Sequence, residues 1–271
     1  NYLSPLRYWL MKQSGIQCVV SIQNGLRTED FISNGAYYNE TDVYEVFGGA
    51  QRTLLERLGC KAGRWIPKGS ISLLSKVPEL KITDSGPIVL IGHDFSYDVG
   101  PYNGRDYNII LRHLRRFSTE HKQVVSYKAR SGSSEELRNY DENLRSDWTR
   151  LDLKTDAYQA VAGAKVCVNY LSSLGTEALG LGKRVLTCNF YGDDLATEKQ
   201  DGFGVVLTTE YQEFERKLLA LLSGASPEID AYFERLRAQR MPMDPGVFEE
   251  LAGICLSARP DGLTQAAGGA R

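Results

Sequence analysis

The sequence contains no apolar run of the roughly 18 residues needed to span a bilayer, so a membrane-crossing chain is not expected. It also lacks an excess of one charge, because 32 Lys and Arg residues are balanced by 34 Asp and Glu residues, for a formal net charge of -2. This balance argues against a generic nucleic-acid-binding protein, although a local basic patch remains compatible with a phosphate ligand. Hydrophobic residues at 42% and charged residues at 24% are ordinary for a globular protein.

The cysteines offer no disulfide framework. Their number, five, is odd, and no C-x-x-C pair occurs. Cys18, Cys167 and Cys188 lie inside apolar runs, where cysteine behaves as a small core residue, so we expect reduced thiols and a cytoplasmic location. A Walker loop, a Ser-His-Asp arrangement and a metal-ligand spacing are missing as well, and we predict neither a cofactor nor a metal site.

The two ends of the sequence have distinct features. The first residue is Asn1 rather than Met, and no secretory signal is visible, so we expect a fragment or a processed chain. The last segment, 258–271, is rich in Gly and Ala and is expected to be a disordered tail.

What the sequence does have is an alternation of short apolar strands with helices of about ten residues. Parallel neighbours need such crossover connections, so the alternation predicts an α/β fold with parallel sheets. A Pro-, Gly- and charge-containing stretch at 75–87 has the composition of a linker between two units. The expected strands are 18–22, 42–47, 62–66, 88–91, 123–127, 149–153, 165–169, 184–189 and 204–207, and the expected helices are 50–58, 105–120, 133–140, 156–162, 174–181, 210–222 and 228–239.

The most informative segment runs from the strand at 165–169 into Ser172-Ser173-Leu-Gly175-Thr176-Glu177. Ligands of a doubly wound sheet bind beyond the carboxyl ends of its strands. Two hydroxyls, a glycine and a helix N-terminus at that edge suit a diphosphate, and a glutamate in the first helical turn suits ribose hydroxyls. The alternative is a helix cap with Ser173 as the N-cap.

This segment resembles the donor-site sequence of GT-B glycosyltransferases, particularly those of bacterial surface-polysaccharide (capsule and lipopolysaccharide) synthesis. Their pattern S-S/T-x-G-x-E-A-x-x-x-G-K-x-V corresponds to Ser172 to Ala178 followed by Gly182-Lys183-Arg-Val185. Upstream pieces at 20–27, 46–48 and 66–70 are also similar. The glutamate pair of many retaining members and the His-Pro motif of bacterial sialyltransferases are absent, so retaining or inverting chemistry stays open.

The resemblance implies a GT-B-like α/β fold of two Rossmann-like lobes with parallel sheets, the N-terminal lobe being short or truncated. We therefore expect a partial, acceptor-side lobe at 1–76 and a donor-binding domain at 77–257. The implied reaction moves a sugar from a nucleotide-sugar donor to a saccharide or lipid-linked acceptor, without a metal. Peripheral association with the inner face of the cell membrane is compatible with such an acceptor. The donor-binding candidates in the loop are Ser172, Ser173, Gly175, Thr176 and Glu177.

Three further clusters follow predicted strands. Gly92-His93-Asp94 would face the interlobe cleft of a GT-B fold, with Gly92 as a donor contact and His93 and Asp94 as catalytic candidates; an ordinary surface loop is the alternative. Lys128 and Arg130 would offset a diphosphate's charge, or are solvated surface cations.

The third cluster, Gln23-Asn24-Gly25-Leu-Arg27, provides amide and guanidinium donors for an acceptor, with Gln23, Asn24 and Arg27 as the candidates. A simple Asn-Gly turn explains the same residues.

Three functions are compatible with these features. The first is a nucleotide-sugar-dependent glycosyltransferase, and the second is a nucleotide-sugar epimerase, whose fold is similar. The third is a noncatalytic lobe that binds a nucleotide or a partner. A product that depends on an acceptor separates the first from the others.

Overall fold

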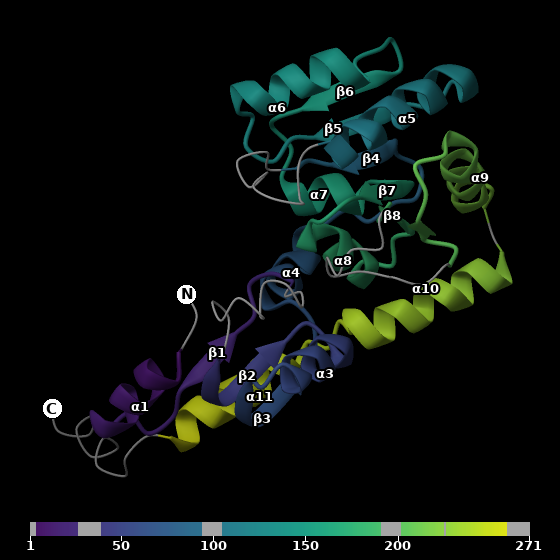
Figure 1. Ribbon diagram of the computed structural model, residues 1–271. Helices are drawn as coiled ribbons and strands as arrows, with labels where there is room; N and C mark the ends of the chain where they lie inside the picture. Colours follow the sequence, from purple (N-terminus) through teal and green to yellow (C-terminus); the bar gives the residue numbers. More distant parts are fainter. Residues whose placement is uncertain (1–3, 27–38, 94–104, 191–201, 225, 259–271) are drawn as a thin grey trace, which may run out of the picture.

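The computed structural model describes residues 4–26, 39–93, 105–190, 202–224 and 226–258, which form two lobes, each built on a parallel sheet (Figure 1). In the smaller lobe the strand order is β1-β2-β3, with β1 at Val20–Ile22, β2 at Glu40–Val46 and β3 at Lys61–Pro67. Helix α1 (Pro5–Gln13) lies beside this sheet, and α3 (Gly49–Arg57) packs on one of its faces.

The larger lobe holds a six-stranded parallel sheet of order β6-β5-β4-β7-β8-β9. The chain builds outward from β4 through β5 to β6 and then returns beside β4 to continue in the other direction. Its strands are β4 (Ile88–Ile91), β5 (Val125–Lys128), β6 (Thr149–Asp152), β7 (Val166–Asn169), β8 (Val185–Cys188) and β9 (Val205–Val206). The helices are α5 (Arg105–His121), α6 (Ser134–Asn139), α7 (Ala157–Ala162), α8 (Ser173–Gly180) and α9 (Tyr211–Leu222), with a π-helical turn at Tyr140–Leu144.

Burial explains why these short runs form strands. All residues of β4, β7 and β8 are buried, as expected of parallel strands that helices cover on both faces. Helix α5 contributes Tyr107, Ile110, Leu114 and Phe117 to the same core. The two-lobed α/β fold with parallel sheets that the sequence predicts is therefore present.

Two connections pass between the lobes. The first contains α4 (Ile71–Lys76) and a 3-10 turn at Val77–Glu79, and the second joins α10 (Pro227–Arg240) to α11 (Gly246–Ser257). The chain thus returns to the smaller lobe at its end, where Val247 of α11 packs against Val43 and Leu74.

The sequence pattern did not indicate α1, α4 or α11. The proposed division at residues 76 and 77 stays a prediction, but α11, which that division assigns to the second unit, packs on the smaller lobe. Of the tail proposed at 258–271, residues 259–271 lie outside the described residues.

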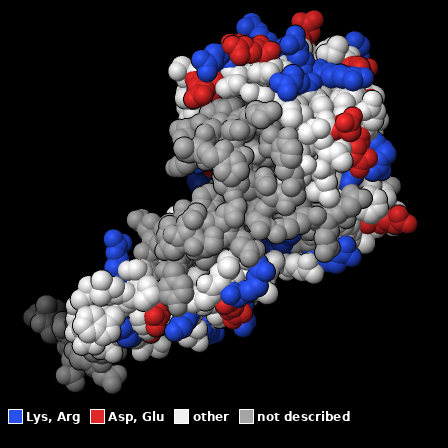
Figure 2. Space-filling view, in the orientation of Figure 1, with Lys and Arg blue, Asp and Glu red and all other residues white. Residues whose placement is uncertain are grey.

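Charges of both signs lie side by side on the face shown in Figure 2, in keeping with the formal net charge of -2. Within the described part of the chain, no helix combines the length and the apolar character that crossing a membrane requires.

Glu45 is the least expected residue of the smaller lobe's core. Its side chain is fully buried in β2, and neither carboxyl oxygen has a hydrogen-bond partner among the described residues. Burial disfavours the charged form and outweighs the nearby backbone N–H of Gln23, so the pKa of Glu45 rises from 4.5 to about 8.

We predict that Glu45 makes the stability of the protein fall as the pH rises. Between pH 4.5 and about 8 the folded protein keeps a proton on Glu45 that the unfolded chain has lost. The free energy of unfolding of the wild type should therefore decrease, relative to that of Glu45→Gln, by up to about 1.4 kcal/mol per pH unit. Urea unfolding of both proteins at several pH values measures this difference, and parallel pH profiles would contradict it.

Candidate functional site

The reversal of strand order places two strand ends next to each other. Gly92 follows β4, and the segment from Tyr170 to Ser172 follows β7, so both lie at the topological switch point, where open α/β sheets bind their ligands. A cavity of about 530 Å³ opens there, a volume typical of small-molecule sites. It is lined by Asn24, Gly25, Leu26, Ile91, Gly92, Lys128, Ala129, Arg130, Thr155, Ala157, Leu171, Ser172, Ser173 and Leu174.

This cavity brings together candidates that are far apart in the sequence. Asn24 comes from the smaller lobe, and the others lie at or just after the carboxyl ends of β4, β5 and β7 in the larger lobe. The lining candidates are Asn24, Gly92, Lys128, Arg130, Ser172 and Ser173. Their contacts with a ligand remain predictions, but their convergence on one cavity is a property of the fold.

The start of α8 forms one wall of the cavity. Ser172 is the N-cap, and its hydroxyl accepts a hydrogen bond from the N–H of Leu174 at 3.3 Å. Asn169, at the end of β7, holds Ser172 from both sides, accepting from its N–H and donating to its carbonyl, each at 3.2 Å. The expected N-cap, Ser173, is instead the first helical residue, because the chain already turns at Ser172.

Gly175 and Thr176 lie behind that wall. A Cβ atom at Gly175 would overlap the Asn169 side chain, so this glycine allows close packing of α8 on β7 and does not line the cavity. Thr176 is also buried, and its hydroxyl has no hydrogen-bond partner within the described chain. It adjoins a void of about 20 Å³, which is large enough for one water molecule.

Glu177 lies one turn deeper than expected. It is the fifth residue of α8 and belongs to the second helical turn, not the first. Its carboxyl oxygen Oε1 accepts hydrogen bonds from Ser70 Oγ at 2.7 Å and from the Tyr158 hydroxyl at 2.9 Å. The side chain is buried, which raises its pKa. A contact with donor ribose therefore stays a prediction, and the contacts seen here are with the protein itself.

The opposite wall is formed by the end of β5, which carries Lys128, and by the loop after it, which carries Arg130. Lys128 is largely buried, with its ammonium 3.3 Å from the carbonyl oxygen of Asp152, whereas Arg130 is exposed. The cavity lining thus contains two cations and no carboxylate among the described residues. Such a site favours an anionic ligand.

Glu136 shapes this wall from behind. Its buried carboxylate accepts hydrogen bonds from the backbone N–H groups of Arg130, Ser131 and Gly132, from the Ser131 hydroxyl and from the Tyr127 hydroxyl. Burial by itself raises the pKa of Glu136, but the hydrogen bonds outweigh it and the pKa is lowered.

Glu136 is not among the site residues predicted from the sequence. The pattern Ser133-x-x-Glu136 is that of a capping box, and Ser133 Oγ does accept from the N–H of Glu136 at 3.2 Å. A capping box points to the start of a helix, not to the loop before it. The glutamate reaches past the N-cap to order residues 130–132, which a local pattern does not reveal.

The remaining candidates have other surroundings. Gln23 is buried, and its side chain accepts from the Phe47 N–H at 2.9 Å and donates to Gln51 at 2.7 Å, so its acceptor contact stays a prediction. The His93 ring packs against Tyr107 and Tyr170, with centroids 5.2 and 5.5 Å away, and does not line the cavity. The other catalytic candidate, Asp94, and the acceptor-side candidate Arg27 lie outside the described residues.

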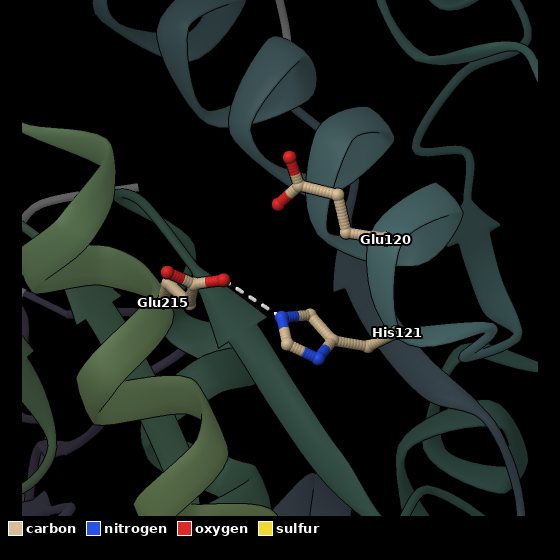
Figure 3. Close-up of side chains that lie close together, drawn as sticks. All are labelled: Glu120, His121 and Glu215. Atoms are coloured by element: carbon tan, nitrogen blue, oxygen red, sulfur yellow. Dashed lines mark hydrogen bonds and ion pairs between the residues drawn. The ribbon is translucent and has the colours of Figure 1, made fainter.

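A cluster of Glu120, His121 and Glu215 joins α5 to α9 elsewhere in the larger lobe (Figure 3). His121 Nε2 lies 2.7 Å from Glu215 Oε1, while Glu120 pairs with Arg116 at 2.8 Å and accepts from the Tyr211 hydroxyl. These groups are close enough to hold a metal ion, but His121 and Glu215 already bind each other, and Glu120 is bound to Arg116 and Tyr211. The cluster therefore links α5 to α9 through polar side chains.

Comparison with known proteins supports the fold. No protein-family model and no curated sequence matches the chain. Among solved structures, a UDP-GlcNAc 2-epimerase from Methanocaldococcus jannaschii is similar over 93% of this chain and 72% of its own, with a TM-score of 0.62 and 12% identity. A sucrose-phosphate synthase from Thermosynechococcus elongatus matches over 94% and 72%, with a TM-score of 0.53 and 16% identity.

A UDP-forming α,α-trehalose-phosphate synthase from Burkholderia xenovorans covers 93% of this chain and 70% of its own, with a TM-score of 0.50 and 11% identity. At such identities the likeness concerns the fold alone. It confirms the GT-B-like α/β fold that the sequence predicts.

We predict that Gly92 cannot be replaced without distorting the cavity wall. A Cβ atom there would lie 2.6 Å from the Lys128 carbonyl oxygen and 2.7 Å from both the Arg130 nitrogen and Glu136 Oε1. Gly92→Ala should therefore lower the free energy of unfolding by about 1–3 kcal/mol. Urea unfolding measures this loss, with Gly163→Ala as the control, because the nearest atom to its Cβ is at an ordinary 3.5 Å. If Gly92→Ala and Gly163→Ala are equally stable, the cavity wall accommodates the added Cβ atom and the prediction is wrong.

Proposed function

We propose that the protein is a nucleotide-sugar-dependent glycosyltransferase that builds a cell-surface polysaccharide or glycolipid. The observation that carries this proposal is the cavity at the switch point between β4 and β7, which gathers Asn24, Gly92, Lys128, Arg130, Ser172 and Ser173 from both lobes. A site between two lobes has room for a donor on one side and an acceptor on the other.

The donor's diphosphate would lie at the start of α8. The positive end of that helix and the hydroxyls of Ser172 and Ser173 favour an anion, and Lys128 and Arg130 on the facing wall add charge. The N–H groups of residues 130–132 are already bound to Glu136. Phosphate contacts on that wall therefore depend on the two cationic side chains.

A uridine diphosphate sugar is the first donor to test. The Methanocaldococcus jannaschii epimerase was solved with UDP-GlcNAc and UDP, and the Burkholderia xenovorans synthase forms UDP. Both share this chain's fold. The proposed reaction proceeds at the cytoplasmic side of the membrane and uses the cavity's own cations, without a metal ion, to stabilise the leaving diphosphate.

A nucleotide-sugar epimerase is the second candidate, because the Methanocaldococcus jannaschii structure has a TM-score of 0.62 to this chain. The two reactions differ in their products. A transferase forms a new glycoside only when an acceptor is present, whereas an epimerase changes the donor alone. A noncatalytic lobe would bind nucleotide and form neither product.

We predict that Arg130→Ala and the double variant Ser172→Ala/Ser173→Ala weaken nucleoside diphosphate binding. A hydrogen bond to a charged group contributes about 1.5–3 kcal/mol, so Arg130→Ala should raise the dissociation constant by roughly 10- to 100-fold. Calorimetry with UDP, GDP, CDP, CMP and TDP measures the effect and identifies the base.

Matched controls come from the same chain. Arg138 is an exposed arginine on α6, and Ser223 is an exposed serine after α9; neither lines the cavity. Arg138→Ala and Ser223→Ala should bind like the wild type. If the cavity variants bind nucleotide with the affinity of the wild type, the nucleotide does not bind in this cavity.

We also propose that the protein contacts a membrane through α1, as a lipid-linked acceptor requires. Tyr8 and Lys12 of α1 bind Asp42 of the smaller lobe, so the helix turns polar side chains inward. Leu6, Trp9 and Leu10 are left exposed at 65%, 55% and 49%. An exposed apolar stripe with tryptophan suits the interfacial region of a bilayer.

We expect Trp9→Ser/Leu10→Ser to reduce the fraction of protein that sediments with phospholipid vesicles. The control is Leu219→Ser on α9, which removes a leucine of 41% exposure far from α1 in the sequence. Equal sedimentation of all three proteins would argue against membrane contact through α1.

A further inference from the structure

The two connections between the lobes touch each other at Gly69 and Ser70. Gly69 has a φ of 105°, and a Cβ atom there would overlap the carbonyl oxygen of Pro242. The Ser70 N–H lies 3.2 Å from Met241 Sδ, and Lys68 pairs with Asp244 at 2.9 Å. We call this contact of residues 68–70 with residues 241–244 the interlobe crossing.

The helix that starts at the crossing belongs to both lobes. Ser70 is the N-cap of α4, where its hydroxyl accepts from the Leu73 N–H at 3.3 Å. Leu73 packs into the core of the larger lobe, and Leu74 packs under the smaller sheet beside Val247. A change in the position of α4 would therefore move one lobe relative to the other.

Glu177 connects this crossing to the cavity. Its Oε1 accepts from Ser70 Oγ at 2.7 Å, and Ser70 is only 2% exposed. The same helix, α8, begins at the cavity with Ser172 and Ser173. The second donor to Oε1, Tyr158, follows Ala157, which also lines the cavity.

We infer that Glu177 is a positioning residue that fixes the relation of the two lobes by accepting the Ser70 hydroxyl. This inference rests on the proposed function, because it sets where Asn24 of the smaller lobe stands relative to the donor loop. The hydrogen bond between the buried side chains of Ser70 and Glu177, which are 107 positions apart, constrains the crossing more than a solvent-exposed contact would. Both hydroxyls donate to Glu177 Oε1, but Ser70 is part of the crossing, whereas Tyr158 lies in α7 of the larger lobe.

That difference provides a matched pair of variants. Ser70→Ala and Tyr158→Phe each remove one hydroxyl from the same oxygen, but only Ser70→Ala removes a hydroxyl that belongs to the crossing itself. Ser70→Thr keeps both the hydroxyl and the helix cap. Spin labels at Thr53→Cys on α3 and Arg138→Cys on α6, both exposed positions, report the interlobe distance in a Cys18→Ser/Cys255→Ser background.

Ser70→Ala should broaden the distance distribution, whereas Tyr158→Phe and Ser70→Thr should keep that of the wild type. Ser70→Ala should also raise the dissociation constant for UDP by about 2- to 10-fold, the effect of one net hydrogen bond. A narrow distribution in Ser70→Ala, or equal broadening in Tyr158→Phe, would overturn the positioning role.

Glu177→Gln separates this role from a contact with ribose. The amide keeps a carbonyl oxygen that accepts both hydroxyls, so distances and UDP affinity should stay within about threefold of the wild type. A larger loss of affinity at an unchanged distance would assign Glu177 to the ribose and overturn our inference. If the wild type binds no nucleoside diphosphate, the proposed function fails, but the distance distributions still decide the role of Glu177.

Discussion

The reversal of strand order between β4 and β7 is the constraint on which the candidate site depends. Connections from the two strands leave in opposite directions, so their carboxyl ends cannot be covered by the same crossover helix. The opening that remains is bounded by Gly92 at the end of β4, by the segment at the end of β5 and by the start of α8. None of these segments is adjacent in the sequence, and only the sheet order brings them to one edge.

Each wall of that opening is held by a side chain that does not line it. Asn169 brackets Ser172 and fills the space that Gly175 leaves, which fixes the start of α8. Glu136 performs the same task for residues 130–132, and Gly92 leaves room for that arrangement. The protein's own side chains therefore hold both walls of the cavity in place.

The sequence predicted the part of this arrangement that follows from periodicity and topology. Apolar runs such as 88–91 and 165–169 identify the strands, and polar residues after them mark the carboxyl edge. The features that the sequence could not predict depend on contacts between residues that are far apart in the chain. The buried face of α11 is recognisable only beside Val43 and Leu74, and the hydrogen bond between Glu177 and Ser70, 107 positions away, cannot be inferred from the pattern around Glu177. The predicted N-cap, Ser173, was one residue away from the observed one, Ser172. A rule based on residue type cannot distinguish two consecutive serines.

Three buried glutamates show why residue type alone does not fix chemistry. Glu136 accepts five hydrogen bonds, and its pKa is lowered in spite of its burial. Glu177 accepts two, both from hydroxyls, and its pKa is raised. Glu45 has no hydrogen-bond partner for its carboxyl among the described residues, and its pKa rises to about 8.

The pKa shifts of the three glutamates follow the number of hydrogen-bond donors around each carboxyl group. Each N–H or O–H directed at the carboxylate replaces part of the hydration that burial removes. The three residues therefore differ in what they can do at neutral pH. Glu136 is a fixed anion that organises backbone N–H groups beside the cavity. Glu177 accepts hydrogen bonds from two hydroxyls, that of Ser70 in the connection between the lobes and that of Tyr158 in α7. Glu45 lies fully buried in the core, where burial favours its protonated form.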